Sequence, residues 1–236
     1  MKISRGQLLS LALVGGAFVI TAILYPHLPD RVPTHWGLNG PPDRYTDKPW
    51  GPFVLPLTMV GLYVVLSLLP AISPRGFRME QFRRTYEVIK ATIMGFLFLI
   101  MVMAHLAALG KVVAVGQFIF AAVGLLLLVL GNYMGKVTKN FFVGIRTPWT
   151  LASDEVWLRT HRLGGKLFVL AGLVLIVCAI AGLGLIPGLV AIGAASLIPV
   201  IYSYVIYRRI EGFKNHPPEN GSPDDAGAGH FAGKSR

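Results

Sequence analysis

A histidine close to two hydroxyl residues is the first arrangement that could support chemistry. His161 follows Thr150 and Ser153 in the polar stretch 140–166. A histidine can act as general base for a hydroxyl nucleophile when the two side chains are within hydrogen-bond reach. The stretch supplies no nucleophile elbow, no metal cluster and no convincing catalytic dyad of carboxylates. We therefore expect His161 to be a packed residue beside Trp157, and we predict no catalytic site and no cofactor.

A second group of potential ligands lies in the loop 26–51. It contains His27, Asp30, His35 and Asp43, whose side chains are all metal-binding types. Their spacing matches no known ligand template, and the prolines of the loop prevent a helical pair of ligands four residues apart. We predict a structural loop without a metal, and leave open whether His27 or His35 binds one. The aromatic residues of the loop are expected at the membrane interface: Trp36, Tyr45 and Trp50.

The third candidate is His105, which lies inside an apolar run. It is six residues before Lys111, and Gln117 is six residues after it. A tight turn at Gly110-Lys111 would place both side chains at similar depth. Ionisable residues inside a membrane are functional candidates by default. A structural hydrogen bond between His105 and Gln117 is the preferred interpretation over a proton relay, which normally needs a chain of carboxylates.

The composition places these residues in an integral membrane protein. The chain is 54% hydrophobic and 14% charged, whereas soluble domains carry about 25% charged residues. The net charge of +11 comes from residues between apolar runs rather than from one basic face, so we expect no direct contact with nucleic acid. The single cysteine, Cys178, implies no disulfide framework. Six runs are long enough to span a membrane: 7–25, 52–72, 91–109, 112–133, 167–186 and 189–207.

The distribution of positive charge predicts the orientation. Eighteen of the 22 Lys and Arg residues precede the first run, follow the last, or lie in the segments 73–90 and 134–166. Because cytoplasmic loops are enriched in these residues, we predict that both termini are cytoplasmic and that the loop 26–51 is extracytoplasmic. The run 8–25 is longer than the apolar core of a signal peptide and lacks a cleavage site, so we expect a retained first helix.

The predicted fold is an all-α integral membrane protein, a six-transmembrane-helix bundle with both termini inside. It consists of a two-helix module (1–72), a cytoplasmic amphipathic segment (73–90), a four-helix module (91–207) and a disordered cytoplasmic tail (208–236). The loop 26–51 is predicted to be an irregular cap or a short hairpin. Small residues four apart predict close helix contacts at three places: Ala12/Gly16, Gly131/Gly135 and Gly184/Gly188. Pro187-Gly188 is the expected turn between the last two helices.

Two polar segments are expected to form short elements on the cytoplasmic surface. In 73–90 an apolar side (Phe77, Phe82, Tyr86, Ile89, Ile93) alternates with a polar side (Arg78, Arg83, Arg84, Glu87, Lys90). This pattern favours an interfacial helix on anionic lipids, with a protein partner as the alternative. In 134–166 we predict a rigid turn at 146–150, then a short interfacial helix 154–163. Ser153 would cap it, Glu155 would pair with Arg159, and Gly164-Gly165 would end it.

The same segments carry a family resemblance. The runs NFFVGIRTPWTL, VW and TH in 140–161 resemble the signature of the SdpI-type bacterial immunity proteins. The run LPDRVPTHWGLNGPPDRY in the first loop resembles the small domain of unknown function that commonly precedes that signature. The two motifs cover about residues 10–207 in the expected order. The resemblance implies a multi-pass plasma-membrane protein that protects a cell from a secreted toxic peptide and draws a repressor to the membrane. The tail is not part of the pattern.

The resemblance also implies two sets of site residues. The set on the cytoplasmic signature, expected to bind a partner, is Asn132, Asn140, Gly144, Arg146, Thr147, Pro148, Trp149, Thr150, Trp157 and His161. The set in the extracytoplasmic loop is Pro29, Pro33, His35, Gly40, Asp43 and Tyr45.

Two other functions remain as alternatives. A small transporter would need polar groups near the midplane at broken helices, and the runs contain only scattered polar residues with Pro56 and Pro199. A membrane-embedded metal-dependent enzyme would use His161 or the histidines of the first loop. Membrane lipids are expected partners in every case, and the oligomeric state stays open.

Overall fold

Six long apolar helices form the protein, as the sequence predicts. The computed structural model describes residues 3–37, 42–73, 79–111 and 114–212. The six helices are α1 (Arg5–Leu24), α2 (Val54–Leu68), α3 (Arg83–Ala108), α4 (Val115–Met134), α6 (Asp154–Ala181) and α7 (Ile186–Ile210). Each is long and apolar enough to cross a membrane. Shorter elements are η1 (Tyr25–His27), η2 (Gly51–Phe53), η3 (Met79–Phe82) and α5 (Pro148–Ala152). The predicted all-α membrane fold is confirmed.

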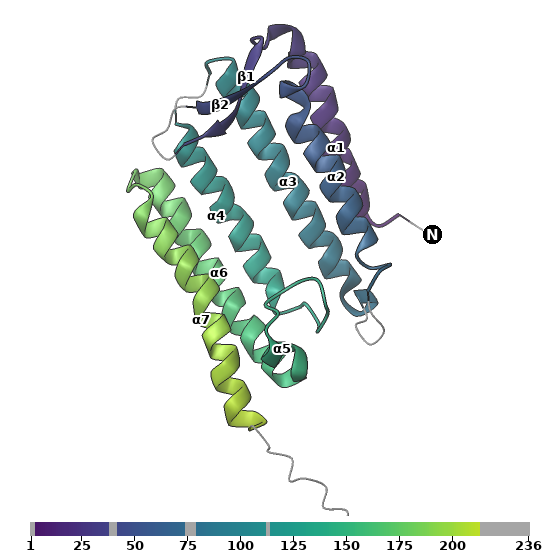
Figure 1. Ribbon diagram of the computed structural model, residues 1–236, viewed down its shortest axis with the longest axis vertical. Coiled ribbons are helices and arrows are strands. Elements are labelled where there is room, and N and C mark those ends of the chain that lie inside the picture. The colour runs from purple at the N-terminus through teal and green to yellow at the C-terminus, as the bar shows by residue number, and fades with distance from the viewer. Residues whose placement is uncertain (1–2, 38–41, 74–78, 112–113, 213–236) are drawn as a thin grey trace, which may run out of the picture.

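The helices pack in two groups. One contains α1, α2 and α3, the other contains α4, α6 and α7, and the groups meet where α3 contacts α4. Helices α1 and α2 contact α3, while α4 packs along α6, and α6 along α7; α3 also contacts α4 (Figure 1). A core of buried side chains joins α1, α2 and α3; it is formed around Ala17, Met59, Met94 and Met101. The third span therefore packs with the first two helices as well as with α4.

Glycines allow α4 and α6 to approach closely. A Cβ on Gly165 would lie 2.6 Å from the carbonyl oxygen of Gly131, and one on Gly172 would lie 2.5 Å from that of Gly124. Contacts this short leave no room for a side chain, as at other interfaces between membrane helices. The prediction of a close contact holds for Gly131 and for Gly188, where a Cβ would lie 2.7 Å from Cδ2 of Leu175, whereas nothing lies within 4 Å of a Cβ on Gly184.

Two predicted helix ends are wrong. Gly164 and Gly165 lie inside α6, which runs without a break from Asp154 into the membrane span, so the short helix 154–163 is not a separate element. The chain instead turns at Gly182 and Gly184, both with positive φ. Pro187 occupies the first turn of α7 rather than the turn before it, a position that proline tolerates because helix N-termini leave N–H groups unpaired.

The first loop forms a β-hairpin, the second of the two predicted alternatives. Strands β1 (Arg31–Trp36) and β2 (Pro42–Asp47) pair antiparallel. The hairpin lies at the opposite end of the bundle from α5 (Figure 1). The starts of α1 and α3 and the ends of α4 and α7 lie at the α5 end. The segments that charge counting assigns to one side thus share one end; which end faces the cytoplasm stays a prediction. The tail beyond Gly212 lies outside the described residues, and α7 continues three residues past the predicted boundary at 207.

Candidate functional site

The α4–α5 loop (residues 135–147) is held in shape by the buried side chain of Asn140. This residue is 0% exposed. Its amide nitrogen donates to the carbonyl oxygens of Thr138 (3.0 Å) and Val143 (2.9 Å). Its oxygen accepts from the backbone N–H groups of Phe142 (2.8 Å) and Val143 (2.6 Å). One side chain therefore satisfies four backbone groups of an irregular segment that has no ladder of its own.

His161 fastens the same loop to α6. Its Nδ1 lies 2.8 Å from the carbonyl oxygen of Trp157, so Nδ1 carries the proton. Its Nε2 then accepts from the backbone N–H of Ile145 at 2.9 Å. Gly144, with φ of +115°, passes over the ring, where a Cβ would lie 2.3 Å from Nε2. Both ring nitrogens bind backbone groups, which leaves neither to activate a hydroxyl; the predicted packed role of His161 is what the geometry shows.

The segment after the loop forms a short helix where a rigid turn was predicted at 146–150. Thr147 is extended, as a residue before proline should be, and it caps α5 in a capping box with Thr150. The Thr147 hydroxyl lies 3.0 Å from that of Ser203 on α7. The ring of Trp149 packs edge-on against Tyr204, with centroids 5.0 Å apart. Helix α5 is thereby fixed to the end of α7.

The predicted features at the start of α6 are present. Ser153 caps the helix by accepting from the N–H of Val156, and Asp154 and Glu155 stand in its first turn. Glu155 and Arg159 form an ion pair at 2.5 Å. Ser153 also donates to a carboxylate oxygen of Glu211 at 2.7 Å, which ties α6 to the end of α7.

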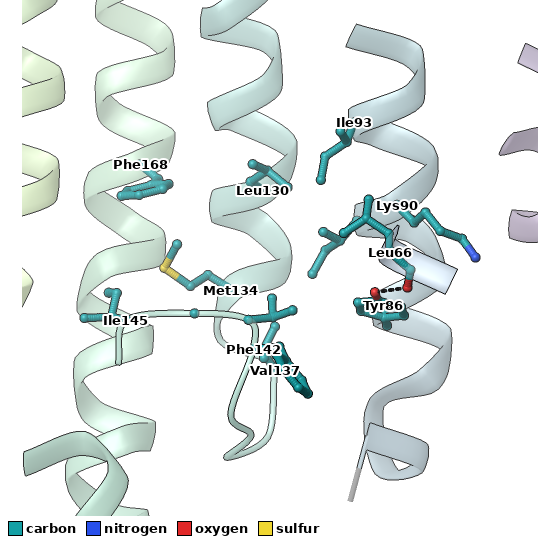
Figure 2. A pocket seen from close by; sticks show the side chains of 13 residues that line it. Leu66, Tyr86, Lys90, Ile93, Leu130, Met134, Val137, Phe142, Ile145 and Phe168 are labelled. Atoms are coloured by element: carbon teal, nitrogen blue, oxygen red, sulfur yellow. Dashed lines mark hydrogen bonds between the residues drawn. The ribbon is translucent and has the colours of Figure 1, made fainter. Parts of the chain in front are cut away.

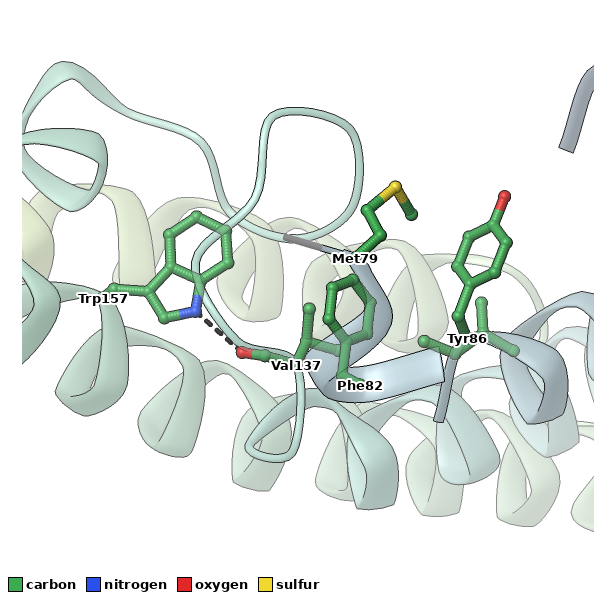
Figure 3. Close-up of a cluster of buried hydrophobic side chains, with 6 residues drawn as sticks. Met79, Phe82, Tyr86, Val137 and Trp157 are labelled. Atoms are coloured by element: carbon green, nitrogen blue, oxygen red, sulfur yellow. Dashed lines mark hydrogen bonds between the residues drawn. The ribbon is translucent and has the colours of Figure 1, made fainter. Parts of the chain in front are cut away.

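Trp157 lies in the protein core. It is 2% exposed, stacks on His161 with centroids 4.0 Å apart, and donates from Nε1 to the carbonyl oxygen of Val137 at 2.8 Å (Figure 3). The cluster around it is formed by the apolar side of η3 and α3: Met79, Phe82, Tyr86 and Ile89. The prediction that this side faces lipid is therefore wrong for the described residues, because the α4–α5 loop covers it. Phe77 and Arg78 lie outside them.

An apolar pocket of about 330 Å³ opens between α3, α4 and the α4–α5 loop. Figure 2 shows Tyr86 and Ile93 on one wall and Leu130 and Met134 on the other. The loop closes its end with Phe142, Val143, Gly144 and Ile145. The hydroxyl of Tyr86 donates to the carbonyl oxygen of Leu66, which also lines the pocket. Residues of the signature thus form one end of the pocket.

Two charged residues of the predicted polar side of the segment 73–90 are buried instead of exposed. Glu87 is 7% and Lys90 1% exposed, and they form an ion pair at 3.1 Å. The Lys90 ammonium also lies 5.0 Å from the ring centroid of Tyr63 on α2. Buried charges are expected to be paired in this way. The alternation of residue types along 73–90 predicted a helix, which is present. It did not predict what packs against the polar side of that helix, where α1 and α2 cover Glu87 and Lys90.

The signature residues thus divide into those that hold the loop and α5 in place and those that do not. Six hold the loop and α5: Asn140, Gly144, Thr147, Thr150, Trp157 and His161. Asn132, Arg146 and Pro148 are exposed, and Trp149 is half-buried. Arg146 donates from Nη1 to the carbonyl oxygen of Phe141 at 2.6 Å, which fixes its guanidinium on the loop surface. The loop thus carries an exposed positive charge that its own backbone holds in place.

The other predicted set lies on and beside the hairpin. His35 and Asp43 pair across the strands at 2.6 Å, and the His35 hydrogen bond lowers the pKa of the exposed Asp43 carboxyl below its ordinary value of 3.8. Pro33 is buried, whereas Pro29 and Tyr45 are exposed. Gly40 lies outside the described residues. Within those residues, no three His, Cys, Asp or Glu side chains come together as a metal site would require.

The predicted bond between His105 and Gln117 is absent. His105 is buried, with Nδ1 2.7 Å from the carbonyl oxygen of Met101, and its Nε2 has no partner among the described residues. Gln117 is exposed and lies near Gly182, on the α6 side of α4. Equal depth therefore did not bring the two side chains together, because they point from their helices in different directions.

Comparison with known proteins identifies both segments. Residues 136–203 match the sequence model of the SdpI/YfhL protein family, and residues 12–60 match a domain of unknown function, DUF1648. The chain is 27% identical over 215 residues to a Bacillus subtilis (strain 168) protein named "Immunity protein SdpI", an alignment that covers 88% of this chain and 99% of that protein. No solved structure matches. The predicted family resemblance is confirmed.

Proposed function

We propose that this chain, whose sequence carries the SdpI/YfhL signature behind a DUF1648 segment, is a membrane-embedded immunity protein that protects its cell from a secreted toxic peptide. The observation that carries the proposal is the match to an immunity protein over 99% of that protein's length. The arrangement of the fold supports it. A β-hairpin stands at one end of the bundle and a rigid basic loop at the other (Figure 1), so one molecule has a separate surface on each side of the membrane.

In this proposal the hairpin end faces outward and meets the peptide. The positive-inside rule assigns that end to the outside. The α4–α5 loop then faces the cytoplasm, where its exposed Arg146 contacts a repressor protein. Asn140 and His161 hold the loop in one conformation, so binding there costs little conformational entropy. The protein has no catalytic role in this account.

The transporter alternative receives less support from the helices. Pro56 and Pro199 do not unwind α2 or α7, which are continuous over Val54–Leu68 and Ile186–Ile210. Transporter sites are typically built at discontinuous helices near the midplane, and the described spans contain none.

Survival of a sensitive host tests protection directly. Cells that express the chain are challenged with a secreted toxic peptide to which the host is sensitive, and compared with cells that carry an empty vector. We expect higher survival with the chain. Equal survival at matched expression would refute the immunity role.

Recruitment of the repressor is tested separately with Arg146→Ala. The exposed Arg209 at the same end of the bundle provides the control, Arg209→Ala. We expect Arg146→Ala to abolish membrane recruitment of a fluorescent repressor at unchanged protein level, and Arg209→Ala to retain it. Recruitment that persists in Arg146→Ala would show that the partner does not bind through this residue.

A further inference from the structure

A second apolar pocket lies beneath the hairpin, at the opposite end of the molecule from the signature. Its volume is about 290 Å³. Strand β1 and η2 form its roof, and α2, α3 and α4 form its walls. The lining is mostly apolar, with Trp36 in the roof and Leu55, Ile100, Ala104 and Ile119 in the walls. None of the signature residues lines it.

His105 is the buried polar residue in the wall of this pocket. It is 2% exposed. A carbonyl oxygen can only accept, so the 2.7 Å contact with the carbonyl of Met101 places the proton on Nδ1. The neutral ring then presents an unprotonated Nε2, which is an acceptor. Nδ1 is turned back onto its own helix, and the ring of His105 is part of the pocket lining.

This acceptor is unsatisfied. Nε2 of His105 is buried and has no hydrogen-bond partner among the described residues. The contrast with His161 is direct, since the same tautomer there leaves an Nε2 that accepts from the N–H of Ile145. Buried polar atoms are nearly always paired, and an exception in a native protein calls for an explanation. A ligand that brings a donor supplies the missing partner.

The lining defines what that ligand must be. A charged group would lose its hydration among apolar side chains with no opposite charge beside it. A group with only acceptors would face the Nε2 lone pair. The pocket therefore suits an apolar, ring-sized group that carries one N–H or O–H donor, as the indole of tryptophan does.

We propose that the pocket under the hairpin binds such a side chain of an apolar peptide, with its N–H or O–H donated to Nε2 of His105. That this side chain belongs to a toxic peptide rests on the proposed function. The exposed His35 and half-buried Trp36 lie on the strand that roofs the pocket, so a peptide arriving at the hairpin end reaches it without crossing the bundle. The pocket itself is inferred from geometry alone.

The pocket is tested with small probes on the full chain in lipid nanodiscs. The protein is labelled with ¹⁵N-histidine, and indole is compared with indene, which has the same shape but no N–H. We expect indole to shift the Nε2 resonance of His105 and indene to leave it unchanged. The His161 resonances serve as the internal control. An unmoved His105 signal, or an equal shift with indene, would overturn the proposal.

Two variants should prevent binding in different ways. His105→Leu deletes the acceptor, and Ile119→Trp fills the space from α4. Ile119→Trp keeps the histidine, so its His105 signal reports directly that the probe is excluded. We expect indole to leave that signal unmoved. A shift as large as in the original chain would show that the probe binds elsewhere.

The survival assay separates the pocket from the proposed function. If the original chain protects and His105→Leu does not, at equal expression, the peptide is supported as the source. If both protect equally, the peptide does not use this pocket and that part of the proposal fails. If the original chain gives no protection, the proposed function fails while the indole result still decides the pocket.

Discussion

Gly144→Ala is the substitution that the α4–α5 loop should tolerate least. Gly144 has φ of +115°, and an added Cβ would lie 2.3 Å from Nε2 of His161 and 3.1 Å from its Cδ2. The His161 ring cannot move away easily, because it is stacked on Trp157 and held by that residue's carbonyl oxygen. The loop must shift instead, and the N–H of Ile145 loses its acceptor.

The expected cost follows from two effects. A residue with a side chain in this backbone region is strained by roughly 1–3 kcal/mol. A buried N–H left without a partner costs about 1–3 kcal/mol. The two effects overlap, because relaxation of one relieves the other, so we expect a loss of about 2–5 kcal/mol in the free energy of unfolding.

The assay is equilibrium unfolding in detergent, followed by tryptophan fluorescence, since Trp157 lies beneath the loop. Gly193→Ala is the control, because nothing lies within 4 Å of a Cβ built there and alanine favours a helix more than glycine does. We expect that control to be neutral or slightly stabilising. If Gly144→Ala unfolds like the original chain, the loop is not fastened to His161 as described.

Two further predictions concern other parts of the fold. Gly165→Ala should lower the free energy of unfolding by about 1–3 kcal/mol through overpacking, because its Cβ would lie 2.6 Å from the carbonyl oxygen of Gly131. The control Gly61→Ala should not lower it, because nothing lies within 4 Å of a Cβ there. Equal unfolding midpoints for the two variants would refute the close approach of α4 and α6. In the hairpin, the pKa of Asp43 is lowered by its hydrogen bond to His35, so the pairing stabilises the folded form above the ordinary value of 3.8 and is lost as the pH falls through the lowered pKa. Asp43→Asn should abolish this acid-dependent change in the NMR signals of β1 and β2; an identical acid transition in that variant would assign it to another group.

The spans and the start of α6 could be predicted from sequence because their signals are local. Apolar runs of sufficient length have few other stable conformations in a membrane. Ser153 followed by Asp154 and Glu155 is a helix start whatever surrounds it. The pair of Glu155 and Arg159 needs only the helix itself to form.

The errors concern what each element packs against. Gly164-Gly165 fits both a helix end and a close helix contact, and only the position of Gly131 on α4 decides between them. The apolar side of η3 and α3 fits lipid as well as it fits Trp157 and Val137. His105 and Gln117 share a depth, but the rotation of each helix about its own axis is set by distant packing.

The sequence resemblance identified the signature residues, and the structure distinguishes their roles. Asn140 and His161 were candidates for contact with a partner. The polar atoms of Asn140 instead bind the loop's own backbone, and those of His161 bind backbone groups of the loop and of α6. A signal was present for His161, since the histidine follows Trp157 by one helical turn. No pattern in the sequence indicated that Glu87 and Lys90 would be buried as a pair.

The central claim is that the hairpin faces the outside, where a peptide arrives, and the α4–α5 loop faces the cytoplasm. Single cysteines test it most directly, with Cys178 replaced by alanine. Trp50→Cys marks the hairpin end, where Trp50 is 69% exposed, and Arg209→Cys marks the α5 end. With a membrane-impermeant thiol reagent on intact cells, we predict that position 50 is labelled and that position 209 is labelled only after permeabilisation. The reverse pattern would contradict the account.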